Sequence, residues 1–313
     1  MKFYVGVTDD QWFQFLASRH PHPDEVNFWR PSGQHEHWGP IPKGSLFLFK
    51  LHHPNNFIVG GGYFVKYIRL SVSWAWMTFL EKNGADNRDQ LYKSIRKYNS
   101  KSHSHNPMIG CTLLAEPFFW EKEQWISSPP EWPKNIVQGK SFDSEDNTVG
   151  ARLWNQVKPL LAKPLLEQKK SLQEVEKHYG TPQIVQPRIG QGIFRALVAD
   201  AYQWRCSITG ERTQPVLEAA HIKPYSKEGP HAVNNGLLMR SDFHILFDRG
   251  YIGIDSDFKI KISSKIKEEF KNGREYYAYQ NQKLKVFPEE RSEYPSQEYL
   301  EWHLNHCYER FLA

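Results

Sequence analysis

One stretch of the sequence, residues 218–248, limits what this chain can fold into more than any other. Its polar residues recur at a fixed spacing, His221-x13-Asn235-x8-His244-x3-Asp248. Apolar residues flank the first histidine and follow the asparagine, which predicts two short strands joined by a loop. A helix is predicted next, with His244 and Asp248, four residues apart, on one face of it.

These residue types suit the cleavage of a phosphodiester. An imidazole ionises near neutral pH, so it can take a proton from an attacking water. A hard cation best stabilises the leaving alkoxide, and one imidazole plus one carboxylate leave positions open for phosphate oxygens and water. A single histidine is usually a core or surface residue without such a role. Four polar residues in this register favour the chemical interpretation.

The pattern resembles the HNH nuclease motif, the ββα-metal fold. The resemblance implies that His221, at the end of the first strand, deprotonates the attacking water and that Asn235 bridges the hairpin and orients it. It also implies that His244 and Asp248 hold a divalent metal ion, Mg²⁺ or Mn²⁺. One departure is Ala220, which stands where many members of the superfamily carry an Asp or a second His. Either water or Glu218, two residues back on the same strand face, completes the shell, or the metal is held weakly.

A second departure concerns structural zinc. Many relatives brace the fold with two Cys-x-x-Cys pairs, whereas here Thr209 follows Cys206, and Arg240 and Phe243 occupy the place of the later pair. We therefore expect no structural zinc, with Cys206 as a small buried residue.

The whole chain has 313 residues, enough for two domains, and a formal net charge of +5, which is compatible with a nucleic-acid partner. Its three cysteines are far apart and odd in number, which argues against a disulfide framework. No signal peptide opens the sequence and no apolar run is long enough to span a membrane. We expect a cytoplasmic protein without a membrane partner.

The first 145 residues read as mostly antiparallel strands with interspersed helices. The predicted elements are strands at residues 2–7, 45–51, 57–70 and 108–120, and helices after Thr8 and over 72–82 and 89–98. The glycines at 60–62 lie inside a strand pattern without the Lys-Ser/Thr of a phosphate loop. They predict a bulge or a close backbone approach.

This half resembles the PUA-like superfamily, and within it the EVE and related modified-base readers, because of its opening strand, tryptophan-bearing loop, Pro-x-Gly turn and glycine-bearing strand. A flipped base is held by stacking between flat side chains. The candidates for such a pocket are Trp29, Trp38, Tyr63 and Phe64, with Asn27 or Arg30 able to reach a base edge. The alternative is that these rings belong to the core.

We therefore expect an α+β chain with three parts: a PUA-like mixed β-barrel domain at 1–145, a helical connector at 146–186 and an HNH nuclease domain at 187–313. In the last part the sequence predicts a helix at 192–202, strands near 251–255, 258–263 and 283–287, and a terminal helix at 297–311. Candidate phosphate contacts are Arg30, Lys223, Lys227 and Arg249.

The pairing of these two domains resembles bacterial modification-dependent restriction enzymes. It implies a double-stranded DNA substrate carrying a modified base, such as 5-methyl- or 5-hydroxymethylcytosine. Because one site cuts one strand, a double-strand break predicts a homodimer. Two alternatives stay open: a nuclease that reads another mark, such as a backbone phosphorothioate, and a DNA-binding module that does not cut.

Overall fold

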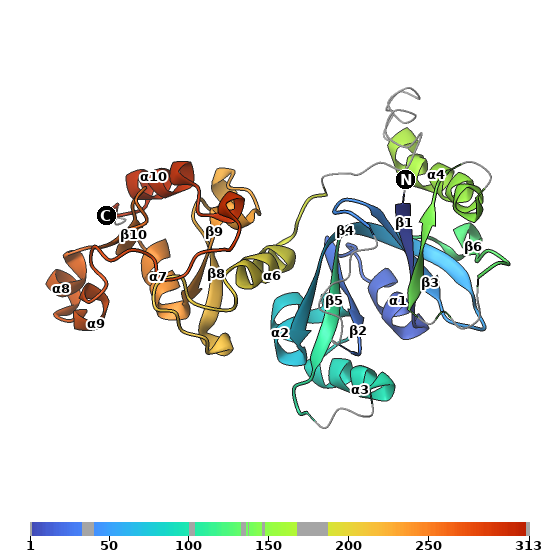
Figure 1. Ribbon diagram of the computed structural model, residues 1–313, viewed down its shortest axis with the longest axis horizontal. Coiled ribbons are helices and arrows are strands. Elements are labelled where there is room, and N and C mark those ends of the chain that lie inside the picture. Colours follow the sequence, from blue (N-terminus) through green and yellow to red (C-terminus); the bar gives the residue numbers. More distant parts are fainter. Residues whose placement is uncertain are drawn as a thin grey trace. The chain divides into compact units, whose positions relative to one another are not determined.

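The computed structural model describes residues 2–32, 41–99, 104–132, 136, 138–145, 148–167 and 187–310, with the side chains of 163–167 left out of the description. These residues separate into two compact units, Met1–Gly190 and Gln191–Ala313, here called the first and second unit (Figure 1). The chain is α+β, with a large mixed sheet in the first unit. No helix in the described ranges is long and apolar enough to cross a bilayer.

The first unit contains the seven-stranded sheet and four α-helices among its described residues. The strands follow the order β2-β5-β4-β3-β1-β7, and β6 pairs with β4. In the described part of this sheet β1 and β3 run parallel, and the other neighbouring strands pair antiparallel. The elements are β1 (Lys2–Thr8), α1 (Asp10–Ala17), β2 (Glu25–Arg30), β3 (Leu46–Leu51), β4 (Phe57–Ser71), α2 (Val72–Phe79), α3 (Arg88–Tyr98), β5 (Met108–Phe119), β6 (Ile126–Ser127), β7 (Gly139–Asp143) and α4 (Val149–Glu167).

Side-chain alternation divides the core of this sheet into two clusters. In β3, Phe47 and Phe49 lie in one cluster and Leu48 in the other, because successive side chains of a strand point to opposite faces. Helix α1 packs on the first cluster through Trp12 and Leu16, among others, while α4 contributes to the second. A strand buried on both faces is largely apolar, and β3 has the apolar run 46–49, with Lys50 as its one charged residue.

The sheet curls around the first cluster. Strands β4 and β5 separate β2 from β3 in the sheet, yet Phe28 of β2 lies with its ring centroid 4.9 Å from that of Phe47 in β3. Likewise Arg30, at the end of β2, donates a hydrogen bond of 3.1 Å to the hydroxyl of Tyr4 in β1. Strands from distant positions in the sheet order therefore meet across the core.

The glycine run in β4 has the predicted roles. The register between β4 and β5 shifts between Gly61 and Tyr63, which is a bulge or irregularity. A Cβ on Gly61 would lie 2.5 Å from the carbonyl oxygen of Phe47, so the backbone approach to β3 requires glycine here.

The second unit is built from short elements. They are α6 (Gln191–Ala201), β8 (Leu217–His221), β9 (Gly236–Arg240), α7 (Ser241–Asp248), β10 (Ile252–Ile254), β11 (Ile260–Ile262), α8 (Lys265–Phe270), α9 (Arg274–Tyr277) and α10 (Gln297–His306). Strands β8 and β9 pair antiparallel, and so do β10 and β11.

Two predictions at the end of the chain were wrong in detail. The predicted strand at 283–287 is only an isolated bridge between Lys283 and Lys259, because the backbone amides of Lys285 and Val286 both bond to the carbonyl of Ser207 instead of forming a ladder. The terminal helix ends at His306.

Of the expected connector, α4 packs in the core of the first unit, and residues 168–186 lie outside the described part.

Candidate active site

The polar residues of the second unit are carried by a hairpin and a helix, in the predicted order of strand, loop, strand and helix. Strand β8 ends at His221, which pairs with Gly236 at the start of β9. Helix α7 follows β9 directly at Ser241. Leu217 and Ala220 in β8 and Leu237 in β9 are fully buried. Burial of these apolar side chains holds the hairpin, and with it His221, in place.

His221 is held between an aromatic ring and a second histidine. Its imidazole stacks on Phe194 of α6 at 3.8 Å between centroids and 12° between planes. Its Nε2 lies 2.9 Å from Nδ1 of His231. Burial, together with the nearby His231 and His244, lowers the pKa of His221 to about 4, although Asp248 acts in the opposite direction. The ring is therefore neutral at pH 7 and can accept a proton.

Asn235 closes the loop between the two strands. Its side chain is fully buried; Nδ2 donates to the carbonyls of Lys223 and Pro230, and Oδ1 accepts from the amide of Lys223, each at 2.9 Å. Its backbone carbonyl accepts from Ile222. The side-chain bonds of Asn235 thus go to the loop backbone, and they link the two ends of the loop.

His244 on α7 lies between two carboxylates. Its Nδ1 is 2.7 Å from Oε2 of Glu218 on β8, and its Nε2 is 3.2 Å from Oδ2 of Asp248. Desolvation would lower the pKa of His244, but the hydrogen bonds and charges of Asp248 and Glu218 outweigh it and raise this pKa. Glu218 thus fixes the orientation of the ring from the side opposite Asp248.

This arrangement fits a cation held by two protein ligands. When Nδ1 of His244 donates its proton to Glu218, the lone pair of Nε2 faces the carboxylate of Asp248, and two facing acceptors favour a cation between them. With 3.2 Å between them, Nε2 of His244 and Oδ2 of Asp248 are close enough that both would hold one divalent ion. Within the described ranges no three His, Cys, Asp or Glu side chains gather as a metal-binding group. Water and substrate oxygens would occupy the other positions.

One cavity of about 360 Å³ joins these groups. It is lined by His221, His244 and Asp248, with Gln191, Ala219, Ile222, Pro224, Tyr225, His303 and Cys307 around them. The predicted base and the two predicted metal ligands therefore face the same space. Asn235 lies outside the lining, in the loop that it closes.

The candidate phosphate contacts differ in their surroundings. Lys227 and Arg249 are exposed beside the hairpin and α7, whereas the Nζ of Lys223 lies 5.8 Å from the centroid of the Trp302 ring. Arg30 belongs to the first unit, where its guanidinium bonds to Tyr4 and Gln138.

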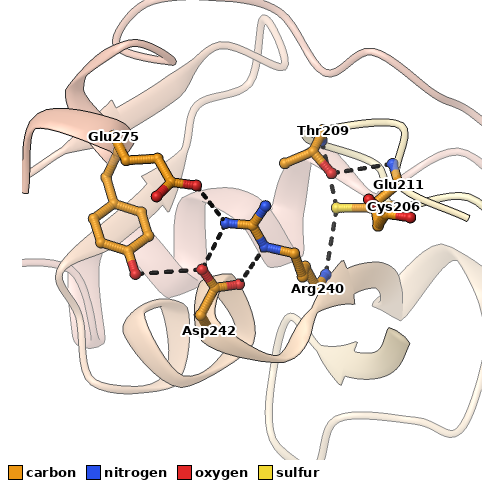
Figure 2. Close-up of polar contacts among 7 residues, drawn as sticks. Cys206, Thr209, Glu211, Arg240, Asp242 and Glu275 are labelled. Carbon is orange, nitrogen blue, oxygen red and sulfur yellow. Dashed lines mark hydrogen bonds and ion pairs between the residues drawn. The ribbon is translucent and has the colours of Figure 1, made fainter. Parts of the chain in front are cut away.

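Cys206 and Arg240, which stand at positions compared above with the zinc-binding cysteines, make polar contacts (Figure 2). The thiol of Cys206 is fully buried and accepts backbone N–H bonds from Thr209 at 3.4 Å and Arg240 at 3.3 Å. The guanidinium of Arg240 forms two 2.7 Å bonds to Asp242 and one of 2.9 Å to Glu275. These contacts brace the junction between β9 and α7, where the helix that carries His244 begins.

The four candidate pocket residues that the structure describes do not gather in one place. Asn27 is fully buried, and its amide donates to Asn83 and to the sulfur of Cys111. Phe64 lies in the first core cluster, and Tyr63 packs against the second. Trp29 is half-buried and donates its indole N–H to the carbonyl of Asn83. Trp38 lies outside the described residues.

A cavity of about 320 Å³ does exist in the first unit, with other residues around it. Of the predicted residues it includes Trp29 and Arg30. The remaining lining is Val7, Thr8, Asp9, Trp12, Phe28, Pro31, Ser32, His52, Tyr98 and Gln138. These positions come from β1, β2, α1, α3 and the segments after β3 and before β7, so no local spacing in the sequence could have grouped them.

His231, the partner of His221, was not among the residues predicted from the sequence. It stands in the loop between β8 and β9 without a spacing that would have distinguished it from other surface histidines.

One segment of the chain matches a known protein family. Residues 206–255 match the family of HNH endonucleases, whose members generally use a divalent metal ion. No curated protein matches the sequence. Among solved structures, a variant of the ZmASCH protein from Zymomonas mobilis is 13% identical over 38% of this chain and 76% of that chain, with a TM-score of 0.26. The modification-dependent TagI restriction endonuclease is 12% identical over 97% of this chain and 81% of that chain, with a TM-score of 0.27. The family match contains the hairpin and α7 with their polar residues, and the chain therefore carries an HNH endonuclease domain.

Proposed function

We propose that this protein is a modification-dependent DNA endonuclease in which the second unit cuts and the first unit reads a modified base. The observation that carries the cutting half is the second-unit cavity, where His221 faces the same space as His244 and Asp248 inside the segment matched to HNH endonucleases. Its reaction is metal-dependent hydrolysis of a phosphodiester in double-stranded DNA.

His221 is the general base of this proposal. It is neutral at pH 7 because burial holds its pKa near 4, and it lines the cavity in which a phosphate and its attacking water would bind. His244 and Asp248 would hold the divalent ion, Mg²⁺ or Mn²⁺, and Glu218 keeps the imidazole of His244 in place. A bound ion would stabilise the negative charge that develops on the leaving oxygen.

The first-unit cavity supports the reading half. Trp29 and Tyr98 offer flat side chains at its wall, while Asp9, Arg30 and Gln138 supply polar groups. A volume of about 320 Å³ is near the lower end of the range of small-molecule pockets, as one extruded base requires. We propose 5-methyl- or 5-hydroxymethylcytosine as the base, and a PUA-like fold for this unit.

The remaining parts of the proposal concern DNA and assembly. Lys223, Lys227 and Arg249 surround the hairpin and α7 as candidate phosphate contacts, which bind without reading sequence. Selectivity therefore has to come from the first unit. A double-strand break needs two nuclease sites, so we propose that a homodimer cuts.

A cleavage assay tests this proposal. Matched duplexes carry plain cytosine, 5-methylcytosine, 5-hydroxymethylcytosine, N6-methyladenine or a phosphorothioate linkage, each with Mg²⁺ or Mn²⁺, beside the His221→Ala variant. Cutting confined to a modified-cytosine duplex, and lost in the variant while DNA binding persists, is the expected result. Equal cutting of all duplexes would refute the reader, and a variant that cuts as well as the parent would refute His221 as the base.

A second candidate is a DNA-binding module that does not cut. It is favoured by Ala220, which leaves the described residues without a third protein ligand for the metal ion. Binding to a modified duplex without any cutting in Mg²⁺ or Mn²⁺ would support this function in place of the first.

A further inference from the structure

His231 contacts His221, the base of the proposed reaction, and has no role in that reaction as proposed above. It lies in the loop that joins β8 to β9, and its Nδ1 is 2.9 Å from Nε2 of His221. The ring of His231 is held in place by Tyr225, which stacks on it at 4.5 Å and 14°. Phe194, which stacks on His221, also lies with its centroid 5.6 Å from that of His231.

The loop backbone that carries His231 is fixed as well. Asn235 donates from Nδ2 to the carbonyl of Pro230, the residue directly before His231, and to the carbonyl of Lys223. Gly229 packs so closely that an added Cβ would lie 2.9 Å from Nδ2 of Asn235. The buried amide of Asn235 therefore determines where His231 stands, and through it the position of the His221 ring.

A contact between two imidazole nitrogens constrains where protons can be. It is a hydrogen bond only if one nitrogen carries a hydrogen and the other a lone pair. A base must offer a lone pair to water, and Nε2 of His221 is occupied by His231. The nitrogen left for water is then Nδ1, so the hydrogen of neutral His221 has to be on Nε2 and is donated to Nδ1 of His231.

We propose that His231 is a positioning residue that holds His221 in the Nε2–H tautomer, with Nδ1 directed to the attacking water. This inference rests on His221 being the base of the proposed function. When His221 takes a proton from water at Nδ1, its Nε2–H bond to His231 persists and keeps the ring in the same orientation. In the described part of the chain no carboxylate bonds to His221, so His231 orients the ring as a carboxylate does in many catalytic triads, without supplying a negative charge.

The test compares two substitutions of His231 in the full-length protein. His231→Phe keeps a flat ring between its neighbours but removes the acceptor, and His231→Asn restores an acceptor oxygen close to the place of Nδ1. Cleavage is measured at saturating Mn²⁺ over a range of DNA concentrations, so that kcat and KM are separated. His306→Phe, at an exposed position of α10, is the matched control for a histidine-to-phenylalanine change.

We expect His231→Phe to lower kcat by roughly 10- to 100-fold with little change in KM, as when a group that orients a reactive residue is lost. His231→Asn should recover most of this loss, and the control should cut like the parent. Equal cutting by His231→Phe and the parent would overturn the proposal. So would equal losses in the Phe and Asn variants, because packing alone would then explain both.

A second measurement needs no activity and no substitution of His231. In protein labelled with ¹⁵N-histidine, the chemical shifts of the two ring nitrogens report the tautomer, and His221→Ala assigns the signals. We expect neutral His221 to carry its hydrogen on Nε2, and a hydrogen on Nδ1 would overturn the proposal. If His221→Ala still cuts DNA, His221 is not the base of the proposed function, whereas an inactive His221→Ala beside a fully active His231→Phe refutes only the role of His231.

Discussion

Acid should destabilise the second unit through His303. This side chain is 2% exposed, its ring stacks on Phe247 at 3.7 Å and 5°, and its Nε2 donates to the carbonyl of Phe247 at 3.1 Å. Its Nδ1 is buried and has no hydrogen-bond partner among the described residues. Protonation would add a buried N–H without an acceptor, and burial accordingly lowers the pKa of His303 to about 4 from 6.5.

The magnitude follows from proton linkage. Above pH 6.5 His303 is neutral in both states, so its contribution to stability is complete. As the pH falls below 6.5 the unfolded chain binds a proton that the folded protein does not bind, and the free energy of unfolding decreases. With a folded pKa of about 4, the loss is about 2 kcal/mol at pH 5 and about 3 kcal/mol at pH 4.

His303→Phe provides the comparison, since it keeps a ring against Phe247 and cannot titrate. Native-state hydrogen exchange, read by mass spectrometry on peptides from α7 and α10, gives the opening free energy of this unit at pH 7.5, 6, 5 and 4 for parent and variant. Carboxylates that titrate in the same range contribute equally to both proteins. The difference between them should change by about 3 kcal/mol in favour of the variant from pH 7.5 to pH 4. A constant difference would show that His303 has an ordinary pKa and would refute this reasoning.

Three further changes have defined outcomes. Asn235→Ala removes three side-chain hydrogen bonds and should cost about 3 kcal/mol in urea unfolding; a loss under about 1 kcal/mol would mean that the loop relaxes without them. Glu218→Gln, which weakens the support of His244, should raise the Mn²⁺ concentration needed for half-maximal cutting roughly 10- to 100-fold, and an unchanged metal titration would contradict that role. Tyr98→Ala removes a half-exposed ring from the first-unit cavity and should weaken binding of a modified duplex by about 1–3 kcal/mol in fluorescence anisotropy. An equal loss on the unmodified duplex would place Tyr98 outside base reading.

The sequence predicted the local elements of both units well where the pattern was strong. The buried run at 46–51 forms β3, and the helices that follow Asp9, Ser71 and Asn87 begin where those side chains accept a backbone N–H. It failed at 283–287, where an alternating pattern predicted a strand. Whether a short segment joins a ladder depends on the partners available to it. Here the amide of Leu284 bonds to the carbonyl of Phe258, whereas those of Lys285 and Val286 share the carbonyl of Ser207.

The aromatic candidates show the same limit. Phe64 and Tyr63 are neighbours in β4 and point to opposite faces, so at most one of them could face a given space. Which face is buried depends on strand pairing and on the curl of the sheet, and neither can be derived from one segment.

The sequence by itself determined which polar residues of the second unit lie on one hairpin and one helix. The spacing of His221, Asn235, His244 and Asp248 is a local property of these elements. Only the tertiary structure decided which other groups join them. His231 contacts His221 because the hydrogen bonds of Asn235 fix the conformation of the loop between them. His303 lines the same cavity as His221, from a helix more than fifty residues further along the chain than α7. The first-unit cavity likewise gathers side chains from separate strands and helices. Contacts of this kind follow from packing between distant segments, for which a sequence pattern of short period carries no information.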